Sequence, residues 1–157
     1  MMLPAKLVEL VRHTYSRCMG PPVDVRSIAR QAGIDVLEGP FVDSELCGLL
    51  HWIHNTPVII VNSRHSWQRQ RFTIAHELYH FMVDMPSPQA ALMLKKGSPQ
   101  GRERHADRFA AQLLMDADLV CGLHQRDMPF GAMCATMGVS KQAMNIRLDE
   151  LRREGRL

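Results

Sequence analysis

The spacing of apolar residues predicts two helices at the start of the chain, followed by strands. Residues 3–18 repeat apolar side chains at intervals of three and four, which is the period of an amphipathic helix. Asp24 fits the N-cap of a short second helix, and Gly33 fits the residue that ends it. Three runs rich in apolar and β-branched residues then predict strands: 34–39, 46–53 and 57–62. The sequence His-Asn-Thr-Pro at 54–57 suits the tight turn of a hairpin between the last two.

The helical period returns in the second half of the chain. A helix is expected from about Trp67 to Val83, because Pro86 follows and cannot continue it. The segment 85–101 is rich in Pro, Gly and Ser, which predicts the most mobile loop of the chain. Another helix is expected to begin near Arg102, with two or three short helices after it. Helices, a small sheet and further helices in this order indicate an α+β fold.

Composition fits a single globular domain. The 157 residues predict one domain, 1–157, and the 46% apolar and 22% charged residues argue against disorder. A net charge of +3 is too small to indicate nucleic-acid binding by itself. No apolar run approaches the roughly 20 residues of a membrane helix, and charges interrupt the apolar pattern of the N-terminus, so neither a membrane span nor a signal peptide is expected. The four cysteines form no CxxC pair, which favours reduced thiols in a cytoplasmic protein.

The sequence RFTIAHELYH at 71–80 carries the candidate chemistry. His76 and His80 are four residues apart, so a helix places both imidazoles on one face, where they can bind one zinc ion. Glu77 can take a proton from a water that this metal activates, which is the HExxH arrangement of metallopeptidases. So short a motif also occurs by chance on surface helices. The apolar strand just upstream favours a peptidase, because an extended substrate can pair along a strand edge beside the metal.

A catalytic zinc site needs a third protein ligand. The continuation HExxHxxGxxH is absent after His80. The next helix carries Glu103 and Asp107, which are four residues apart and therefore share a face. Glu103 can bind the metal, while Asp107 can accept a hydrogen bond from the outer nitrogen of a ligand histidine and fix its orientation. The alternative is that both are solvated acids near a helix N-terminus, where the helix dipole favours them.

Two paired motifs resemble the ImmA/IrrE family of metallopeptidases. They are RQRFTIAHELYH at 69–80 and ERHADRFAAQLLM at 103–115, and together they are far more specific than HExxH alone. The resemblance extends over nearly the whole chain. The segment PVDVRSIARQAGIDV at 22–36 is similar to the usual opening of the family, and VSKQAMNIRLDEL at 139–151 is similar to its closing helix.

The resemblance implies a zincin-like α+β fold, in which a small, mostly antiparallel sheet packs against the HExxH helix and further helices. It implies His76, His80 and Glu103 as zinc ligands and Glu77 as the general base of a zinc metallo-endopeptidase. Mn or Fe could occupy a site of two histidines and a glutamate, according to availability. The resemblance also suggests the substrate and partner: a helix-turn-helix transcriptional repressor of a phage, a mobile element or a toxin–antitoxin pair.

Three residues depart from the family pattern. Tyr79 stands where glycine is usual, Asp107 where asparagine is common, and Asp116 where proline is usual. Asp107 can still hydrogen-bond a histidine. The Tyr79 ring lies next to the metal-binding face, where it either narrows the cleft or offers its hydroxyl to an oxyanion. Tyr79 and Asp107 are therefore candidates for a second layer of residues around the metal.

The C-terminal segment, 128–157, suggests a rival function. Gly138 falls in a turn between two short helices with apolar residues at core-like positions, which is a helix-turn-helix pattern. Basic residues within 138–156 could meet DNA phosphates, although acidic residues dilute them. We expect this pattern to close the peptidase core rather than to bind DNA. The competing hypothesis is a regulatory module that binds a repressor or DNA and has an idle or structural metal site.

Four further histidines and one cysteine are weaker candidates for the site. Three of the histidines lie in or after the hairpin: His51, His54 and His65. One of these could stabilise a tetrahedral oxyanion, but histidines in such places are more often exposed. His105 points about 200° around its helix from Glu103 and should not face the same metal. Cys47 could reach and inhibit the metal, but such a cysteine is more often buried among apolar side chains.

Overall fold

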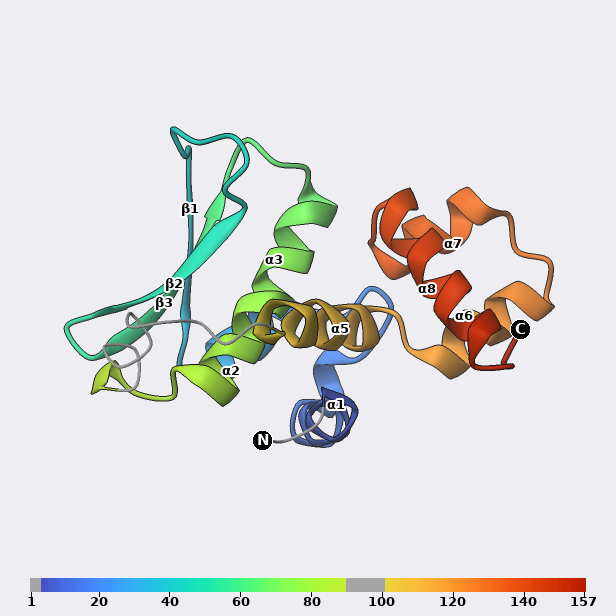
Figure 1. The fold of residues 1–157 in the computed structure, drawn as a ribbon, viewed down its shortest axis with the longest axis horizontal. Helices are drawn as coiled ribbons and strands as arrows, with labels where there is room; N and C mark the ends of the chain where they lie inside the picture. The colour runs from blue at the N-terminus through green and yellow to red at the C-terminus, as the bar shows by residue number, and fades with distance from the viewer. Residues whose placement is uncertain (1–3, 90–100) are drawn as a thin grey trace.

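Helices pack on one face of a small sheet, and a group of C-terminal helices lies beyond them (Figure 1). The structure, a computed structural model, describes residues 4–89 and 101–157. The first elements are α1 (Pro4–Thr14), η1 (Ser16–Cys18), α2 (Val25–Gln31), β1 (Asp35–Gly39), β2 (Gly48–Ile53) and β3 (Thr56–Asn62). The later elements are α3 (Trp67–Tyr79), η2 (His80–Asp84), α5 (Arg102–Leu114), α6 (Ala117–Gln125), α7 (Phe130–Met137) and α8 (Lys141–Arg153).

Local signals in the sequence set several helix ends. Asp24 Oδ1 accepts a hydrogen bond from Ser27 N–H at 3.0 Å and caps α2, while Gly33 has the positive φ of 78° that suits a helix end. Both predictions are confirmed. Ser66 and Ser140 cap α3 and α8 through the same kind of side-chain hydrogen bond. Each cap satisfies a backbone N–H that has no partner inside its helix.

Two predicted helices end in a turn that is tighter or wider than an α-helical turn. The helix predicted over 3–18 is α1 followed by η1, a single turn of 3₁₀-helix. The helix predicted over 67–83 is α3 followed by η2, one turn of π-helix in which Met85 N–H donates to His80 C=O at 2.7 Å. Of the loop predicted over 85–101, residues 90–100 lie outside the described residues.

The predicted α+β class is confirmed, but the sheet is mixed rather than mostly antiparallel. The strand order is β1-β3-β2, with β1 parallel to β3 and β2 antiparallel to it. The hairpin of β2 and β3 follows from the turn between them, as the sequence predicts. The parallel pairing of β1 joins strands far apart in the chain, so no local pattern specifies it. Within the described residues, β2 is therefore an edge strand.

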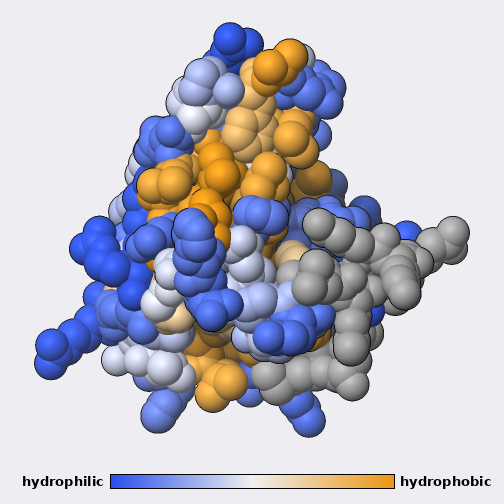
Figure 2. Space-filling model, turned by 90° about the vertical axis from the view of Figure 1, so that its left-hand side faces the viewer, coloured by the Kyte–Doolittle hydropathy of each residue, from blue (hydrophilic) through white to orange (hydrophobic). Residues whose placement is uncertain are grey.

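The two faces of the sheet differ in cover. Val36, Ile59 and Leu50 are neighbours in the strand register and pack against the core, where Ile59 is fully buried. Leu37 lies on the opposite face and is half exposed. Figure 2 shows apolar side chains gathered on this side of the molecule. One face of the sheet therefore forms part of the core, and the other carries exposed apolar surface.

α3 contacts both the sheet and α5, and α1 packs on α5 (Figure 1). One cluster of buried apolar side chains extends from α1 to α8. The organisation of 1–157 as one domain stays a prediction. Among the described residues, no helix has the length and apolar character to cross a membrane.

Gly138 joins the C-terminal helices to α3. Its φ of 63° lies in the left-handed region, and its C=O accepts a hydrogen bond from Arg71 Nε at 3.0 Å. A Cβ at this position would lie 2.9 Å from the Trp67 ring and 2.9 Å from Pro22 Cβ. Glycine is therefore required here both for its backbone conformation and for the close approach of α3.

The substitution Gly138→Ala is expected to lower the free energy of unfolding by about 1–3 kcal/mol, because the new methyl group is strained by φ and overpacks the junction. Urea unfolding followed by circular dichroism measures this change. Gly131→Ala is the matched control, since within the described part of the chain a Cβ there meets no atom of another element within 4 Å, and alanine favours the helix. Equal losses for both variants would contradict the packing described for the junction.

Candidate metal centre

The imidazoles of His76 and His80 converge because the two residues lie one helical turn apart, His76 on α3 and His80 at the start of η2. Their Nε2 atoms are 3.1 Å apart. Glu103 comes from the first turn of α5, with Oε2 at 3.1 Å from His76 Nε2 and Oε1 at 3.5 Å from His80 Nε2. The two helices are held together beside the site by the rings of Tyr79 and Phe109, whose centroids are 5.8 Å apart.

These three side chains fit a metal ion. One ligand atom from each lies within 4.8 Å of the others. Tetrahedral ligands at about 2.0–2.1 Å from a zinc ion are separated by roughly 3.3 Å. The two Nε2 atoms are 3.1 Å apart, and Glu103 places Oε2 at 3.1 Å from one and Oε1 at 3.5 Å from the other, so the three side chains stand at about that separation. The structure therefore brings together the three residues that the sequence nominates as ligands.

Two carboxylates orient the histidine rings. His76 Nδ1 lies 2.9 Å from Asp107 Oδ1, and His80 Nδ1 lies 2.7 Å from Asp84 Oδ2. An ionised carboxylate can only accept a hydrogen bond, so a neutral imidazole at either position carries its proton on Nδ1 and presents a lone pair at Nε2. Two imidazole lone pairs and the carboxylate of Glu103 thus converge with no donor between them. This arrangement is repulsive unless a proton or a cation lies among them.

The acidic surroundings also raise the pKa of His76. Burial acts to lower this pKa, but the hydrogen bond to Asp107 and the charges of Glu77, Asp107 and Glu103 outweigh it. The centre therefore attracts positive charge, whether a proton or a metal ion.

Asp84 is the residue of the centre that sequence analysis missed. Its Oδ1 lies 3.6 Å from Arg102 Nη1, so one carboxylate joins η2 to the start of α5. The available signal was its position four residues after His80. The same spacing relates Glu103 to Asp107, and it places two side chains on one helix face.

Glu77 lines the same pocket as the three candidate ligands, a space of about 270 Å³. Its carboxylate accepts a hydrogen bond from Leu50 N–H of β2. Burial raises the pKa of Glu77 and the charge of Glu103 adds to the increase, while the two histidines and the Leu50 hydrogen bond oppose it. A raised pKa suits a carboxylate that takes up a proton and returns it.

The substitution Asp84→Ala is expected to weaken metal binding by about 10–100-fold, because the His80 ring loses the acceptor that fixes its orientation and tautomer. Competition with a chromophoric zinc chelator measures the affinity. Asp35→Ala, which removes an exposed aspartate of β1, is the control and should leave the affinity unchanged. An unchanged affinity in Asp84→Ala would argue against a role for this carboxylate.

Tyr79 does not line the metal pocket. Its exposed fraction is 0%, and its hydroxyl has no hydrogen-bond partner among the described residues. The ring packs between Phe109 and the edge of the His80 ring, at centroid distances of 5.8 and 5.9 Å. The core position of this ring fits neither a narrowed cleft nor an oxyanion contact.

The other histidines also lie outside the pocket. His51 is exposed on β2, and His54 occupies the hairpin turn with a positive φ of 46°. His65 Nε2 lies 2.9 Å from Ser44 C=O. Neither these three nor His105 is among the described residues that line the metal pocket.

Cys47 is only half buried, which differs from the expected apolar environment. Its sulfur accepts hydrogen bonds from the Arg69 guanidinium, at 3.1 Å from Nη2. The side chain is absent from the described lining of the metal pocket. An inhibitory thiolate contact with the metal therefore has no support in this arrangement.

The helix-turn-helix pattern takes shape as α7, the turn at Gly138 and α8. Several of its cations are engaged within the molecule. Arg147 is buried, and its Nε donates to Met115 C=O at 3.1 Å. Arg152 pairs with Asp149 at 2.8 Å. DNA binding through 138–156 stays a prediction, with fewer cations available to it than the sequence indicates.

Comparison with known proteins places the chain in a family. Residues 29–149 match the model of peptidase M78, described as the IrrE N-terminal-like domain. A solved Mycobacterium tuberculosis transcriptional regulator shares the fold, with a TM-score of 0.65 and 16% sequence identity. That match covers 92% of this chain and 46% of the regulator, so this chain spans less than half of the regulator's length. No curated protein matches the sequence significantly. The zincin-like α+β fold is thus confirmed, and the chain belongs to the peptidase M78 family of IrrE N-terminal-like domains.

Proposed function

We propose that this protein is a zinc-dependent endopeptidase that cleaves a helix-turn-helix transcriptional repressor. The observation that carries the proposal is the meeting of His76, His80 and Glu103 beside the half-buried carboxylate of Glu77. A purely structural metal site has little need for such a carboxylate. Membership of a peptidase family supports the same interpretation.

His76, His80 and Glu103 would hold the zinc ion, with Asp107 and Asp84 orienting the two imidazoles. Three protein ligands are the number found in catalytic zinc sites, whereas structural sites use four. A bound zinc ion would supply the Lewis acidity that polarises a peptide carbonyl and makes a water molecule more acidic. Manganese or iron also suits two imidazoles and a carboxylate, so the identity of the metal is part of the proposal.

Glu77 carries the proton in the proposed reaction. Its carboxylate takes a proton from the attacking water as the water oxygen bonds to the carbonyl carbon. It then gives this proton to the amide nitrogen as the C–N bond breaks, which leaves one new carboxyl terminus and one new amino terminus. The hydrogen bond from Leu50 N–H holds the carboxylate in place during both transfers.

The edge of β2 offers a place for an extended substrate. Gly48 and Leu50 line the metal pocket, and among residues 4–89 and 101–157 no strand pairs with the outer side of β2 in the order β1-β3-β2. Asn62 N–H donates to Cys47 C=O, so the alternation of the antiparallel ladder turns the backbone groups of Gly48 and Leu50 away from β3. Leu50 N–H is donated to Glu77, so a peptide paired along this edge would use the other outward-facing backbone groups and would pass beside the metal ligands.

The substrate class comes from the family resemblance of the paired motifs. The structural relative from Mycobacterium tuberculosis is named a transcriptional regulator, which fits a role of this fold in gene control. A repressor is a folded protein, so cleavage requires an exposed or locally opened segment that can reach the β2 edge.

Incubation of the zinc-loaded protein with a helix-turn-helix repressor whose gene lies next to its own tests the proposal. Intact-mass spectrometry should show two fragments whose masses sum to that of the repressor plus one water. A chelator should stop the reaction, and added zinc should restore it. A stable complex that contains only intact repressor would instead favour a regulatory binding module with an idle metal site.

A further inference from the structure

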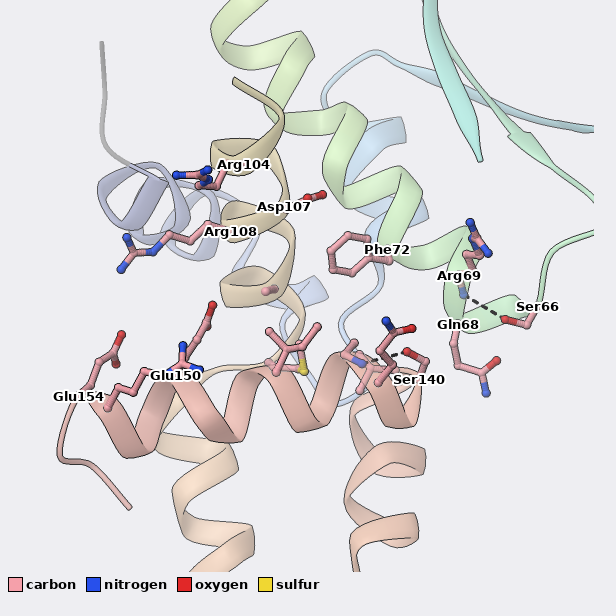
Figure 3. Close-up of a pocket in the computed structure, with 17 residues that line it drawn as sticks. Ser66, Gln68, Arg69, Phe72, Arg104, Asp107, Arg108, Ser140, Glu150 and Glu154 are labelled. Atoms are coloured by element: carbon pink, nitrogen blue, oxygen red, sulfur yellow. Dashed lines mark hydrogen bonds between the residues drawn. The ribbon is translucent and has the colours of Figure 1, made fainter. Parts of the chain in front are cut away.

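A groove of about 860 Å³ lies between α3, α5 and α8, larger than the metal pocket (Figure 3). Protein pockets that bind ligands have volumes of roughly 300–1,000 Å³. Figure 3 shows α5 on one side, Phe72 of α3 on another, and α8 running along the base. Neither the proposed ligands nor Glu77 line this groove.

The floor of the groove is apolar. Phe72, Met115 and Val139 line it together with Ile146, whose side chain is 53% exposed. Covering such a side chain releases water from apolar surface and stabilises a complex. A long apolar floor between helices is the form of site that receives the apolar face of an amphipathic helix.

The wall formed by α5 is basic. Arg104 and Arg108 lie one turn apart on α5 and both line the groove (Figure 3). Within 4–89 and 101–157, no acidic side chain forms an ion pair with either. Asp107 lies between them in sequence, but its carboxylate is hydrogen-bonded to His76. Two unpaired cations beside an apolar floor favour a partner with acidic residues along one edge.

The residues of α8, at the base of the groove, disfavour nucleic acid as the occupant. In a helix-turn-helix protein, the first residues of the second helix contact base edges. Here Gln142 and Ile146, near the start of α8, line the groove instead of facing away from the molecule. Glu150 and Glu154, from the C-terminal end of α8, also line the groove and would repel DNA phosphates.

The groove and the metal centre share a wall. Asp107 lines the groove and holds His76 Nδ1 at 2.9 Å. Phe72 lies four residues before His76 on α3, so it occupies the same helix face one turn away. A partner seated in the groove would therefore lie next to the metal centre.

We propose that this groove docks an amphipathic α-helix of the protein substrate, with its apolar face on Phe72 and Ile146 and acidic residues beside Arg104 and Arg108. The proposal rests on the proposed function in one respect, that the partner is the substrate. The docked helix would hold the substrate while an adjoining extended segment reaches the β2 edge. The groove thus selects the protein, and the metal centre cuts it.

Fluorescence anisotropy with designed peptides tests the groove directly. The probe is a fluorescein-labelled peptide of about 18 residues, long enough to form a helix, with an apolar stripe and glutamates along one edge. The protein is the full chain carrying Glu77→Gln, so that no cleavage interferes. Two comparison peptides share the length: one has lysines for the glutamates, and one has the same composition in an order that destroys the stripe. The first peptide should bind at least about tenfold more tightly than either.

Ile146→Glu should weaken binding of the acidic-edged peptide by about tenfold or more, because a charge would replace an apolar contact in the floor. Arg104→Glu with Arg108→Glu should reverse the preference toward the lysine peptide. Leu37→Glu, at an equally exposed leucine of the sheet, and Arg126→Glu, at an exposed arginine after α6, are the matched controls and should change nothing. Thermal unfolding of each variant checks that the fold is retained.

Three results would overturn the proposal. The first is equal binding of the scrambled peptide, or no binding of any peptide. The second is a dimer in light scattering that Ile146→Glu dissociates, which would make a second copy of this chain the occupant. The third is salt-dependent binding of duplex DNA that the same substitution abolishes.

Kinetics on a cleaved repressor distinguish a failure of the groove proposal from a failure of the proposed peptidase function. An unchanged KM in Ile146→Glu would disprove docking in the groove and leave the proposed peptidase function intact. Binding of the peptide by a protein that cleaves no repressor would disprove the peptidase function and leave docking intact.

Discussion

Replacing Glu77 by glutamine is expected to abolish cleavage of the repressor while metal binding persists. Glutamine has nearly the same shape and its amide oxygen can still accept the hydrogen bond from Leu50 N–H, so the local structure should be kept. It cannot take up a proton at neutral pH. General acid–base groups contribute typically about 10²–10⁴-fold to a rate, so kcat/KM should fall by at least about 10²-fold.

Cleavage rate and metal content are measured on the same preparations, the first by the disappearance of intact repressor and the second by atomic emission. Glu9→Gln, at an exposed glutamate of α1, serves as the control and should cleave like the wild type. A Glu77→Gln variant that cleaves as fast as the wild type would disprove the proposed mechanism. Loss of both metal and activity would instead mark Glu77 as a ligand.

Zinc is expected to raise the unfolding temperature of the wild type and to lose this effect in His80→Ala. A ligand that binds only the folded state stabilises it by about 2.7 kcal/mol at a free concentration of 100 times Kd. For a chain of this size, that corresponds to roughly 5–10 °C in Tm. His80→Ala removes one of the three metal-binding side chains, together with the ring that Asp84 Oδ2 orients, so the variant should bind zinc too weakly to be stabilised.

Scanning calorimetry in chelator and in excess zinc gives the shift for each variant against its own metal-free state. This comparison matters because His80 is buried, so its truncation also lowers the stability of the metal-free protein. His51→Ala, at an exposed histidine of β2, should keep the full zinc-dependent shift. An equal shift in His80→Ala would show that zinc binds somewhere other than the centre described.

The parts of the fold that sequence patterns predicted are those stabilised by near neighbours in the chain. Asp24 caps α2 through Ser27, three residues on, and the β2–β3 hairpin closes over its own turn. The pairing of β1 with β3 was not predictable, because it joins strands with β2 between them in sequence. No turn residue or alternation pattern reports a contact across that distance.

The environment of single side chains was the least predictable feature. Tyr79 looked like a residue of the cleft, yet it packs on Phe109 of another helix and is wholly buried. In the sequence, Arg147 is one of the basic residues within 138–156, yet its guanidinium is buried against the Met115 carbonyl. Both outcomes depend on which helix lies opposite, and a single helix does not contain that information.

The sequence alone determined the local elements and the helical spacing that puts His76 and His80 on one face. It also identified Glu103 and Asp107 as candidates for the metal centre, because residues four apart on a helix must be neighbours. Only the tertiary structure decided that α5 crosses α3 so that Glu103 meets both imidazoles, that Leu50 of the edge strand holds Glu77, and that a groove opens between α3, α5 and α8. These features join segments far apart in the chain, and their positions follow from packing around the shared core rather than from any local preference.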